Sequence, residues 1–340
     1  MISQLTTASR DDDLTVAALD GADGAPVPWD RLTVQPRKRD LFALDFVADE
    51  AWIDIHRMLG GQALPALLNY TYLLIKPEAT VRRCTDAVLR YLARHEFTPV
   101  AIRPLAVNRN ASHHVWRYQW NAATCDRVRL TTFVNDRCRS LLILLRDDSA
   151  SRIPASVRLW ELKGSAHEAR RTAGHLRSVV RMHNRMLGFV HTPDEPADLL
   201  REFGILLDDC DRQFLLKAIL SDQRYQRHDH CDELHAEALR FEAGHAAHAV
   251  SPSEAAARLL AAGSDPVLQV VDAMRRRVNL PLAEVRSAFG QLDDDARRWD
   301  FITIAAEVIA HDRHGVAPII ESKAVAEVTK MWTRYAPVVV

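Results

Sequence analysis

The chain has 340 residues, with 44 basic and 45 acidic side chains and a formal net charge of −1 at pH 7. This balance excludes a strong overall attraction to nucleic acid or an anionic membrane, and 48% hydrophobic with 26% charged residues excludes a largely disordered chain. No apolar run approaches the roughly 18 residues of a membrane span, and the first residues lack a signal-peptide pattern. We therefore expect a cytoplasmic protein with neither a membrane nor a nucleic-acid partner.

The five cysteines are scattered along the chain and include no CxxC pair. This distribution argues against a disulfide scaffold and against a cysteine-rich zinc module. We expect reduced and mostly buried thiols.

The N-terminal part divides into two predicted segments. Residues 1–40 mix charge, glycine and proline without a sustained period, which predicts a flexible leader. Residues 41–67 follow, and their apolar spacing predicts a helical segment that ends at Gly60 and Gly61.

Four apolar runs rich in branched and aromatic residues are predicted as strands, with a helix after the first strand and another after the third. The strands are "NYTYLLIKP", "FTPVAIRPLAV", "SLLILLRDD" and "LGFVH". The order strand, helix, strand, strand, helix, strand is that of the split βαβ, or ferredoxin-like, sandwich. We therefore predict an α+β domain over residues 68–221.

The remainder of the chain, residues 222–340, shows helical patterns only. A capping box at Ser251 to Glu254, with Pro252 at the first helical position, predicts the start of one helix. No repeat of fixed period is present. We predict a separate all-α domain here.

Three basic residues are candidates for binding phosphate. Lys76 ends the first predicted strand and suits a phosphate as a point charge. Arg158 and Arg177 flank a loop with glycines and hydroxyls, and their forked guanidinium groups can clamp phosphates. The alternative for each residue is a solvated surface cation.

His191 ends the fourth predicted strand, and Glu202 follows eleven positions later. If a helix begins near Pro196, the carboxylate lies about two turns into it and can orient the imidazole. An imidazole held at one nitrogen keeps the other free as a nucleophile. The alternative is a structural histidine at the junction of a strand and a helix.

Three separated stretches resemble the nucleoside diphosphate kinase family in order and spacing. The stretch from Ile75 to Glu78 resembles the Ile-Lys-Pro-Asp end of that family's first strand. Residues 162–178 resemble its nucleotide-embracing loop, and 190–207 resemble its His-Gly-Ser-Asp-Ser strand and the helix after it. The resemblance covers roughly residues 68–208 and implies a ferredoxin-like sandwich of the nucleoside diphosphate kinase type.

The resemblance also implies roles for the candidate residues. His191 would be the phosphorylated nucleophile, Glu202 would orient it, and Lys76 would contact the transferred phosphate. Arg158 and Arg177 would grip the phosphates of the nucleotide. The family transfers the γ-phosphate of ATP or another nucleoside triphosphate in two steps, with Mg²⁺ bridging phosphates. We expect a nucleotide, a small-molecule acceptor and a homo-oligomer.

The sequence departs from the family pattern at several positions. Thr192 and Pro193 replace the glycine and serine after the histidine, so Thr192 lies beside the predicted phosphate site, and Gly188 replaces an asparagine. Tyr118 is the candidate to replace the family's nucleotide-binding tyrosine. Two hypotheses stay open: a phosphotransferase with an altered acceptor, or a non-catalytic nucleotide-binding scaffold whose helical part binds a partner.

A third hypothesis places the activity in the histidine-rich helical part. His245 and His248 have the three-residue spacing of metal ligands on one helix face. The surrounding histidines, His228, His230 and His235, match no known metal motif. We therefore predict a polar helix face and keep this pair as the candidate metal ligands.

Overall fold

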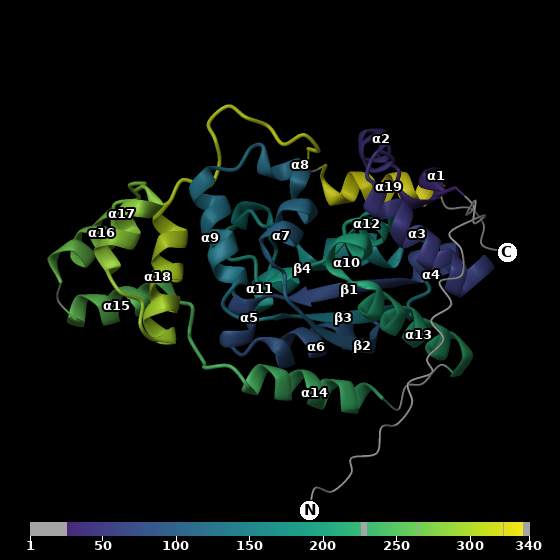
Figure 1. Cartoon of the computed structure of the whole chain (residues 1–340), viewed down its shortest axis with the longest axis horizontal. Coiled ribbons are helices and arrows are strands. Elements are labelled where there is room, and N and C mark those ends of the chain that lie inside the picture. Colours follow the sequence, from purple (N-terminus) through teal and green to yellow (C-terminus); the bar gives the residue numbers. More distant parts are fainter. Residues whose placement is uncertain (1–25, 226–229, 263, 322, 336–340) are drawn as a thin grey trace, which may run out of the picture.

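The structure, a computed structural model, describes residues 26–225, 230–262, 264–321 and 323–335. A four-stranded antiparallel sheet with the order β2-β3-β1-β4 lies at its centre (Figure 1). All four predicted strands are present, although the fourth is short. Their bounds are β1 (Tyr70–Ile75), β2 (Phe97–Leu105), β3 (Ser140–Asp147) and β4 (Val190–His191).

The strand register places the ends of the sheet in different surroundings. His191 lies opposite Leu74, near the carboxyl end of β1. The first residue of β1, Tyr70, lies opposite Arg146 of β3. The end of the sheet that carries His191 is therefore remote from the end at Arg146.

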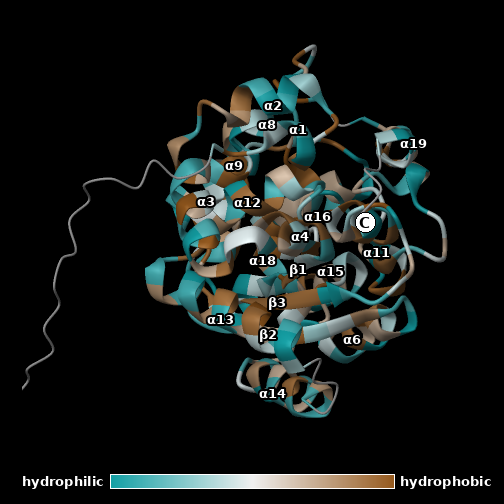
Figure 2. Cartoon of the chain, turned by 90° about the vertical axis from the view of Figure 1, so that its right-hand side faces the viewer, coloured by the Kyte–Doolittle hydropathy of each residue, from teal (hydrophilic) through white to brown (hydrophobic). Residues whose placement is uncertain are grey.

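Helices cover both faces of the sheet because side chains alternate along a strand. In β1, Tyr72 and Leu74 belong to one buried hydrophobic cluster, whereas Leu73 and Ile75 belong to another. The first cluster includes α3 (Phe46–Leu59), α4 (Ala63–Asn69), α12 (Pro196–Leu206) and α13 (Asp209–Tyr225). The second includes α5 (Pro77–Val81), α6 (Thr85–Arg94), α9 (Cys125–Asn135) and α18 (Asp295–Val308). Figure 2 shows the brown ribbon of β3 in the interior, between these layers.

The N-terminal prediction is wrong from residue 29 onward. Two helices form there, α1 (Trp29–Leu32) and α2 (Pro36–Phe42). Their apolar residues Leu32 and Phe42 are buried in the first cluster. These contacts are tertiary, so the local sequence pattern did not show them. Residues 1–25 of the predicted leader lie outside the described residues. Further along, α3 ends before Gly60, as predicted.

Most elements between the strands are helical. The polar stretch after β2 forms α7 (Arg109–Val115), α8 (Arg117–Trp120) and α9. The loop between β3 and β4 carries α10 (Ala155–Lys163) and α11 (Leu176–Val179). Gly164 follows α10 at φ +79°, the left-handed region that favours glycine at a helix end.

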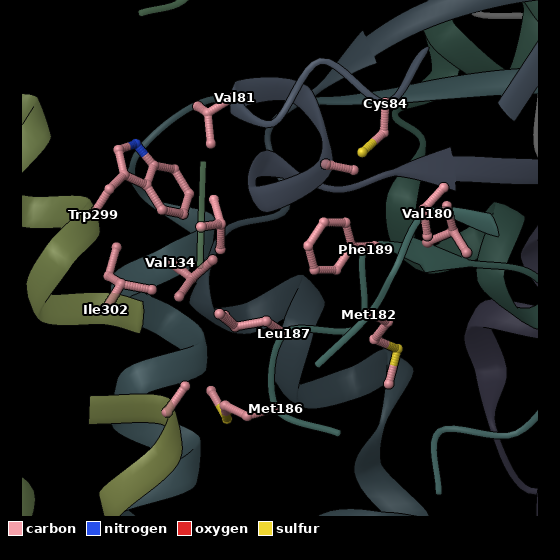
Figure 3. Packing of buried hydrophobic residues seen from close by; sticks show 14 of the residues in the cluster. Val81, Cys84, Val134, Val180, Met182, Met186, Leu187, Phe189, Trp299 and Ile302 are labelled. Atoms are coloured by element: carbon pink, nitrogen blue, oxygen red, sulfur yellow. The ribbon is translucent and has the colours of Figure 1, made fainter. Parts of the chain in front are cut away.

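The predicted C-terminal helices are present. They are α14 (Cys231–Ala243), α15 (Pro252–Ala262), α16 (Asp265–Arg275), α17 (Leu282–Phe289), α18 and α19 (Val325–Tyr335). Figure 3 shows Trp299 and Ile302 of α18 near Val134 and Leu187 in the second cluster. The boundary predicted at residue 221 falls inside α13. The two predicted parts thus share one continuous core.

The segment of residues 309–320, here called the strap, lies on the corner between α8 and α9. The amide of Thr124 donates to the carbonyl of His311 in the strap at 3.1 Å. In the opposite direction, the strap amide of Arg313 donates to the carbonyl of Ala122 at 2.7 Å, and that of Ile319 donates to the carbonyl of Tyr118 at 2.9 Å. The strap also carries Asp312, whose carboxylate accepts from Arg127 and Arg185. The chain after α18 is therefore fixed against the helices that follow β2.

A buried carboxylate joins the two ends of the described chain. Glu195 caps α12 and is fully buried. It accepts hydrogen bonds from Thr33, at 2.8 Å, and from the indole of Trp332 in α19, at 3.0 Å. The Lys38 ammonium lies 2.9 Å away. Burial opposes ionisation of Glu195, but Lys38 and the hydrogen bonds from Val34 and Gln35 together outweigh it, and the pKa of Glu195 is lowered.

Two smaller predictions have different outcomes. None of the described helices is long and apolar enough to cross a membrane. All five cysteines are free, but Cys84 alone is fully buried, while Cys125 and Cys210 are exposed. The prediction of mostly buried thiols is therefore wrong.

Candidate functional site

The centre of the site is an imidazole–carboxylate pair. His191 Nε2 lies 3.0 Å from Oε2 and 3.1 Å from Oε1 of Glu202. The hydroxyl of Tyr72 donates to the same carboxylate. Burial raises the pKa of Tyr72 well above its ordinary value, and the Glu202 charge acts in the same direction. Tyr72 therefore stays protonated and fixes Glu202 as an acceptor.

One ring nitrogen of His191 is left free. The carboxylate of Glu202 can only accept, so in the neutral imidazole Nε2 carries the ring hydrogen and Nδ1 keeps its lone pair. Among the described residues Nδ1 has no hydrogen-bond partner, and the side chain is 15% exposed. Trp116 packs edge-on against the ring, with 5.5 Å between centroids. An oriented imidazole with one accessible nitrogen is suited to nucleophilic attack.

Lys76 lies at the start of α5, next to the segment that leads to His191. Its backbone amide donates to the carbonyl of Phe189 at 3.0 Å, and its Nζ lies 2.7 Å from Oε1 of Glu78. The same Glu78 oxygen accepts from the amide of Phe189 at 3.1 Å. Phe189 has φ +60°, an unfavourable conformation for a bulky residue, and these bonds hold it there.

Arg177 approaches the same segment from α11. Its Nη1 donates to the carbonyl of Gly164 at 2.9 Å and its Nη2 to that of Val190 at 3.4 Å. A Cβ added at Gly188 would lie 3.8 Å from both Arg177 Nη2 and Lys76 Nζ. Two cations therefore meet beside Gly188; we call this place the Gly188 space.

The Arg177 guanidinium at the Gly188 space stays charged at neutral pH. Burial lowers the pKa of Arg177 to about 10, which leaves the guanidinium protonated. Its Nε is buried without a hydrogen-bond partner in the described chain. Two converging cations with an unused donor are suited to an anion such as phosphate.

Lys163 is a further buried cation that the sequence analysis missed. Its Nζ donates to the carbonyl of Thr192 at 3.1 Å and to Asp194 at 3.3 Å. Burial lowers the pKa of Lys163, and the Arg177 charge adds to this effect. Thr192 itself is fully buried and its hydroxyl has no partner among the described residues. Lys163 thus fixes the turn that follows His191.

Arg158 does not join this site. Its guanidinium donates to the carbonyl of His95 at 2.8 Å and lies 3.4 Å from Asp147 and 4.6 Å from the Phe97 ring centroid. Phe97 and Asp147 are paired residues at the end of the sheet remote from His191. The expectation that Arg158 acts together with Arg177 is therefore corrected, because a local carboxylate and carbonyl hold it elsewhere.

Tyr118 also lies away from the site. Its ring stacks on Phe42 at 5.7 Å, and its hydroxyl donates to the carbonyl of Leu41 at 3.2 Å. The residue is buried in the first hydrophobic cluster. The aromatic side chain from this part of the chain that meets His191 is Trp116.

The two candidate metal ligands in the helical part do not face each other. His248 bonds to Asp300 at 3.1 Å, and His245 bonds to the carbonyl of Phe241 at 2.9 Å. His228 lies outside the described residues. Within the described chain, no group of three or more His, Cys, Asp or Glu side chains is placed to hold a metal ion.

Comparisons with known proteins give a structural similarity but no family match. No family model matches the sequence, and no curated protein matches it. Among solved structures, the apo form of a nucleoside diphosphate kinase from Encephalitozoon cuniculi is similar, with 12% sequence identity and a TM-score of 0.35. The similarity covers 42% of this chain and 91% of that one.

Proposed function

We propose that the protein is a phosphotransferase that moves the γ-phosphate of a nucleoside triphosphate through a phosphohistidine at His191. The acceptor is a nucleoside diphosphate or another small molecule. One observation carries this proposal: His191 Nδ1 is free while Nε2 is held by Glu202, and two cations meet beside Gly188 in the segment before His191. The family resemblance of the three sequence stretches supports the same reaction.

The first half-reaction follows from this geometry. The Nδ1 lone pair attacks the γ-phosphorus, and the bond from phosphorus to the bridging oxygen breaks. The nucleoside diphosphate leaves with that electron pair. Glu202 stabilises the positive charge that develops on the ring, and Lys76 and Arg177 offset the charge of the phosphoryl oxygens. In the second half, an acceptor oxygen attacks the same phosphorus and restores the free imidazole.

Magnesium is assigned to the substrate in this proposal. Mg²⁺ usually keeps several waters and is bound largely by substrate phosphates. When bound, it would neutralise phosphate charge and orient the leaving group.

The finer fold assignment belongs to the same proposal. The order β2-β3-β1-β4, with every neighbouring pair antiparallel, supports a ferredoxin-like sandwich of the nucleoside diphosphate kinase type. We also propose that the protein forms a homo-oligomer and that Thr192 borders the bound phosphate through its backbone, since its side chain is buried.

The decisive experiment is phosphoenzyme formation with γ-labelled ATP and magnesium. Wild-type protein should acquire an acid-labile, base-stable label, and His191→Ala should acquire none. His56→Ala is a matched control, because this half-buried histidine lies in α3 against Trp52, outside the site. Equal labelling of wild type and His191→Ala would refute the proposal.

The rival function is nucleotide binding without transfer. Two observations favour it: Lys76 is already paired with Glu78, and Trp116 packs against the His191 ring. It predicts calorimetric binding of ATP by wild type, weakened in Lys76→Gln, together with no label on either protein. The same two measurements therefore separate the two functions.

A further inference from the structure

A polar groove lies beside the site, on the loop between α10 and β4. Its walls include Arg171, Arg181, Thr172 and Ser178, and Glu168 is the one carboxylate among the described residues that line it. The groove therefore combines guanidinium donors with hydroxyl groups. This is the chemistry with which proteins bind phosphate groups.

The two arginines of this groove form no ion pair with the carboxylates that the structure describes. Arg171 donates from Nη1 to the carbonyl of Met182 at 2.9 Å, and its Nε is buried with no partner among the described residues. Arg181 forms no ion pair within the described chain. By contrast, Arg201 and Arg212 elsewhere in the molecule each meet an aspartate, at 2.7 and 2.9 Å. These guanidinium groups therefore keep donors that no carboxylate of the described chain uses, and such donors are suited to an anion.

The groove lies on the same loop as Arg177, which borders the Gly188 space. Arg177 follows Arg171 along the same loop, and the amide of Met182 donates to the carbonyl of Arg177 at 3.0 Å. Arg171 is close enough to Arg177 for their repulsion to add to the lowering of the Arg177 pKa by burial. Two adjoining cationic places can hold two phosphate groups at once.

We propose that this groove is a second anion site, which takes a phosphate or pyrophosphate group in addition to the one at the Gly188 space. The group comes either from a second phosphate of the same substrate or from a separate inorganic anion. The proposal concerns binding and does not depend on phosphate transfer by His191.

Titration of the full chain with inorganic pyrophosphate in a calorimeter tests the proposal. Wild type should bind two equivalents. Arg171→Gln and Arg181→Gln should each weaken one of them by at least about tenfold, since each removes a charge-assisted contact. Lys76→Gln should weaken the other equivalent. Arg170→Gln removes an exposed cation of the same loop that does not line the groove, and it should leave both unchanged.

The exposed residue Arg181 keeps the test valid if Arg171→Gln fails to fold. A single binding event, or none, in wild type would overturn the proposal, as would equal weakening in Arg170→Gln. ATP added to the pyrophosphate complex identifies the source of the anion. If ATP displaces both pyrophosphates, one substrate places phosphates at the Gly188 space and in the groove. If ATP displaces only one pyrophosphate, the groove holds a separate anion. Phosphoenzyme labelling of Arg181→Gln reports on the His191 chemistry independently.

Discussion

Two imidazole–carboxylate pairs of the molecule have the same geometry and different surroundings. His191 meets Glu202 at 3.0 Å in the sheet region, and His248 meets Asp300 at 3.1 Å in the helical region. At His248 the second ring nitrogen, Nδ1, accepts from the amide of Val250 at 3.0 Å. At His191 the second nitrogen has no partner among the described residues.

The surrounding charges differ as well. Arg258 donates to Asp300 at 2.6 Å, so the carboxylate beside His248 is already neutralised. Burial opposes ionisation of Asp300, but His248 and Arg258 outweigh it and lower its pKa. At the His191–Glu202 pair, the cations Lys76 and Arg177 lie beside Gly188, in the segment that leads to His191, and they do not form ion pairs with Glu202. A histidine paired with a carboxylate is therefore not a candidate site by that pairing alone. The His191 pair is distinguished by its free ring nitrogen and by the two cations beside Gly188.

The largest expected difference between the pairs is in phosphoenzyme formation. His191→Ala should lower the labelling rate with γ-labelled ATP by at least about a thousandfold, because it removes the nucleophile. His248→Ala should keep the label on its folded fraction. If His248→Ala lost the label while remaining folded, the distinction drawn between the two pairs would be wrong.

The second prediction concerns charge at the Gly188 space. Lys76→Gln should lower the labelling rate by about a hundredfold, because one of two converging cations is lost where phosphoryl charge must be stabilised. Arg158→Gln is the matched control and should label normally, since Arg158 lies at the remote end of the sheet. Rates from quenched-flow labelling at saturating ATP give the comparison.

The third prediction separates the pairs by stability. His248→Ala should lower the free energy of unfolding by about 2 kcal/mol, because two buried hydrogen bonds are lost. His191→Ala should lower it by less than about 1 kcal/mol, because Glu202 is the one polar partner of its ring among the described residues. Urea unfolding followed by circular dichroism measures both; a larger loss for His191→Ala would contradict the comparison.

A fourth prediction addresses pH through Asp198, one turn before Glu202. Burial raises its pKa to about 7, with Asp194 and Glu202 adding to the effect and Lys38 opposing it. The folded state therefore binds more protons than the unfolded state between about pH 4 and 7, so stability falls as the pH rises through this window.

Asp198→Asn tests this sign directly. Wild type should lose about 1 to 2 kcal/mol of unfolding free energy between pH 5 and 7, and the variant should lose less. Asparagine keeps an acceptor for Lys38 and for the amide of Glu195, so the fold is retained. Urea unfolding at both pH values supplies the numbers, and an unchanged slope in the variant would assign the titration to another group.

The sequence predicted the parts of the fold that local patterns determine. The four strands follow from short apolar runs, and α15 begins at Pro252 as its capping box indicated. His191 and Glu202 were paired correctly because a strand end and the next helix turn are close along the chain. Tyr72 could have been added, since the alternation of side chains puts it on the same face as Leu74, which lies opposite His191.

Long-range contacts account for what the sequence did not show. Trp116, between α7 and α8, and Lys163, at the end of α10, reach the site from elements whose position depends on tertiary packing. Arg158 was misplaced for the same reason: its partner Asp147 comes from the far end of β3. The helices at residues 29–42 were missed because their stability comes from a distant core and from Glu195.

The hydrogen bonds of Glu195 make the helix that carries Glu202 sensitive to mutations at distant positions in the chain. This carboxylate starts the helix that carries Glu202, and its donors come from Thr33 near one end of the described chain and Trp332 near the other. A nonsense mutation that removes only α19 would leave the carboxylate without its indole donor. Substitutions at Thr33 or Trp332 would therefore act on the helix that carries Glu202, and exchange of the sheet region alone would break these hydrogen bonds.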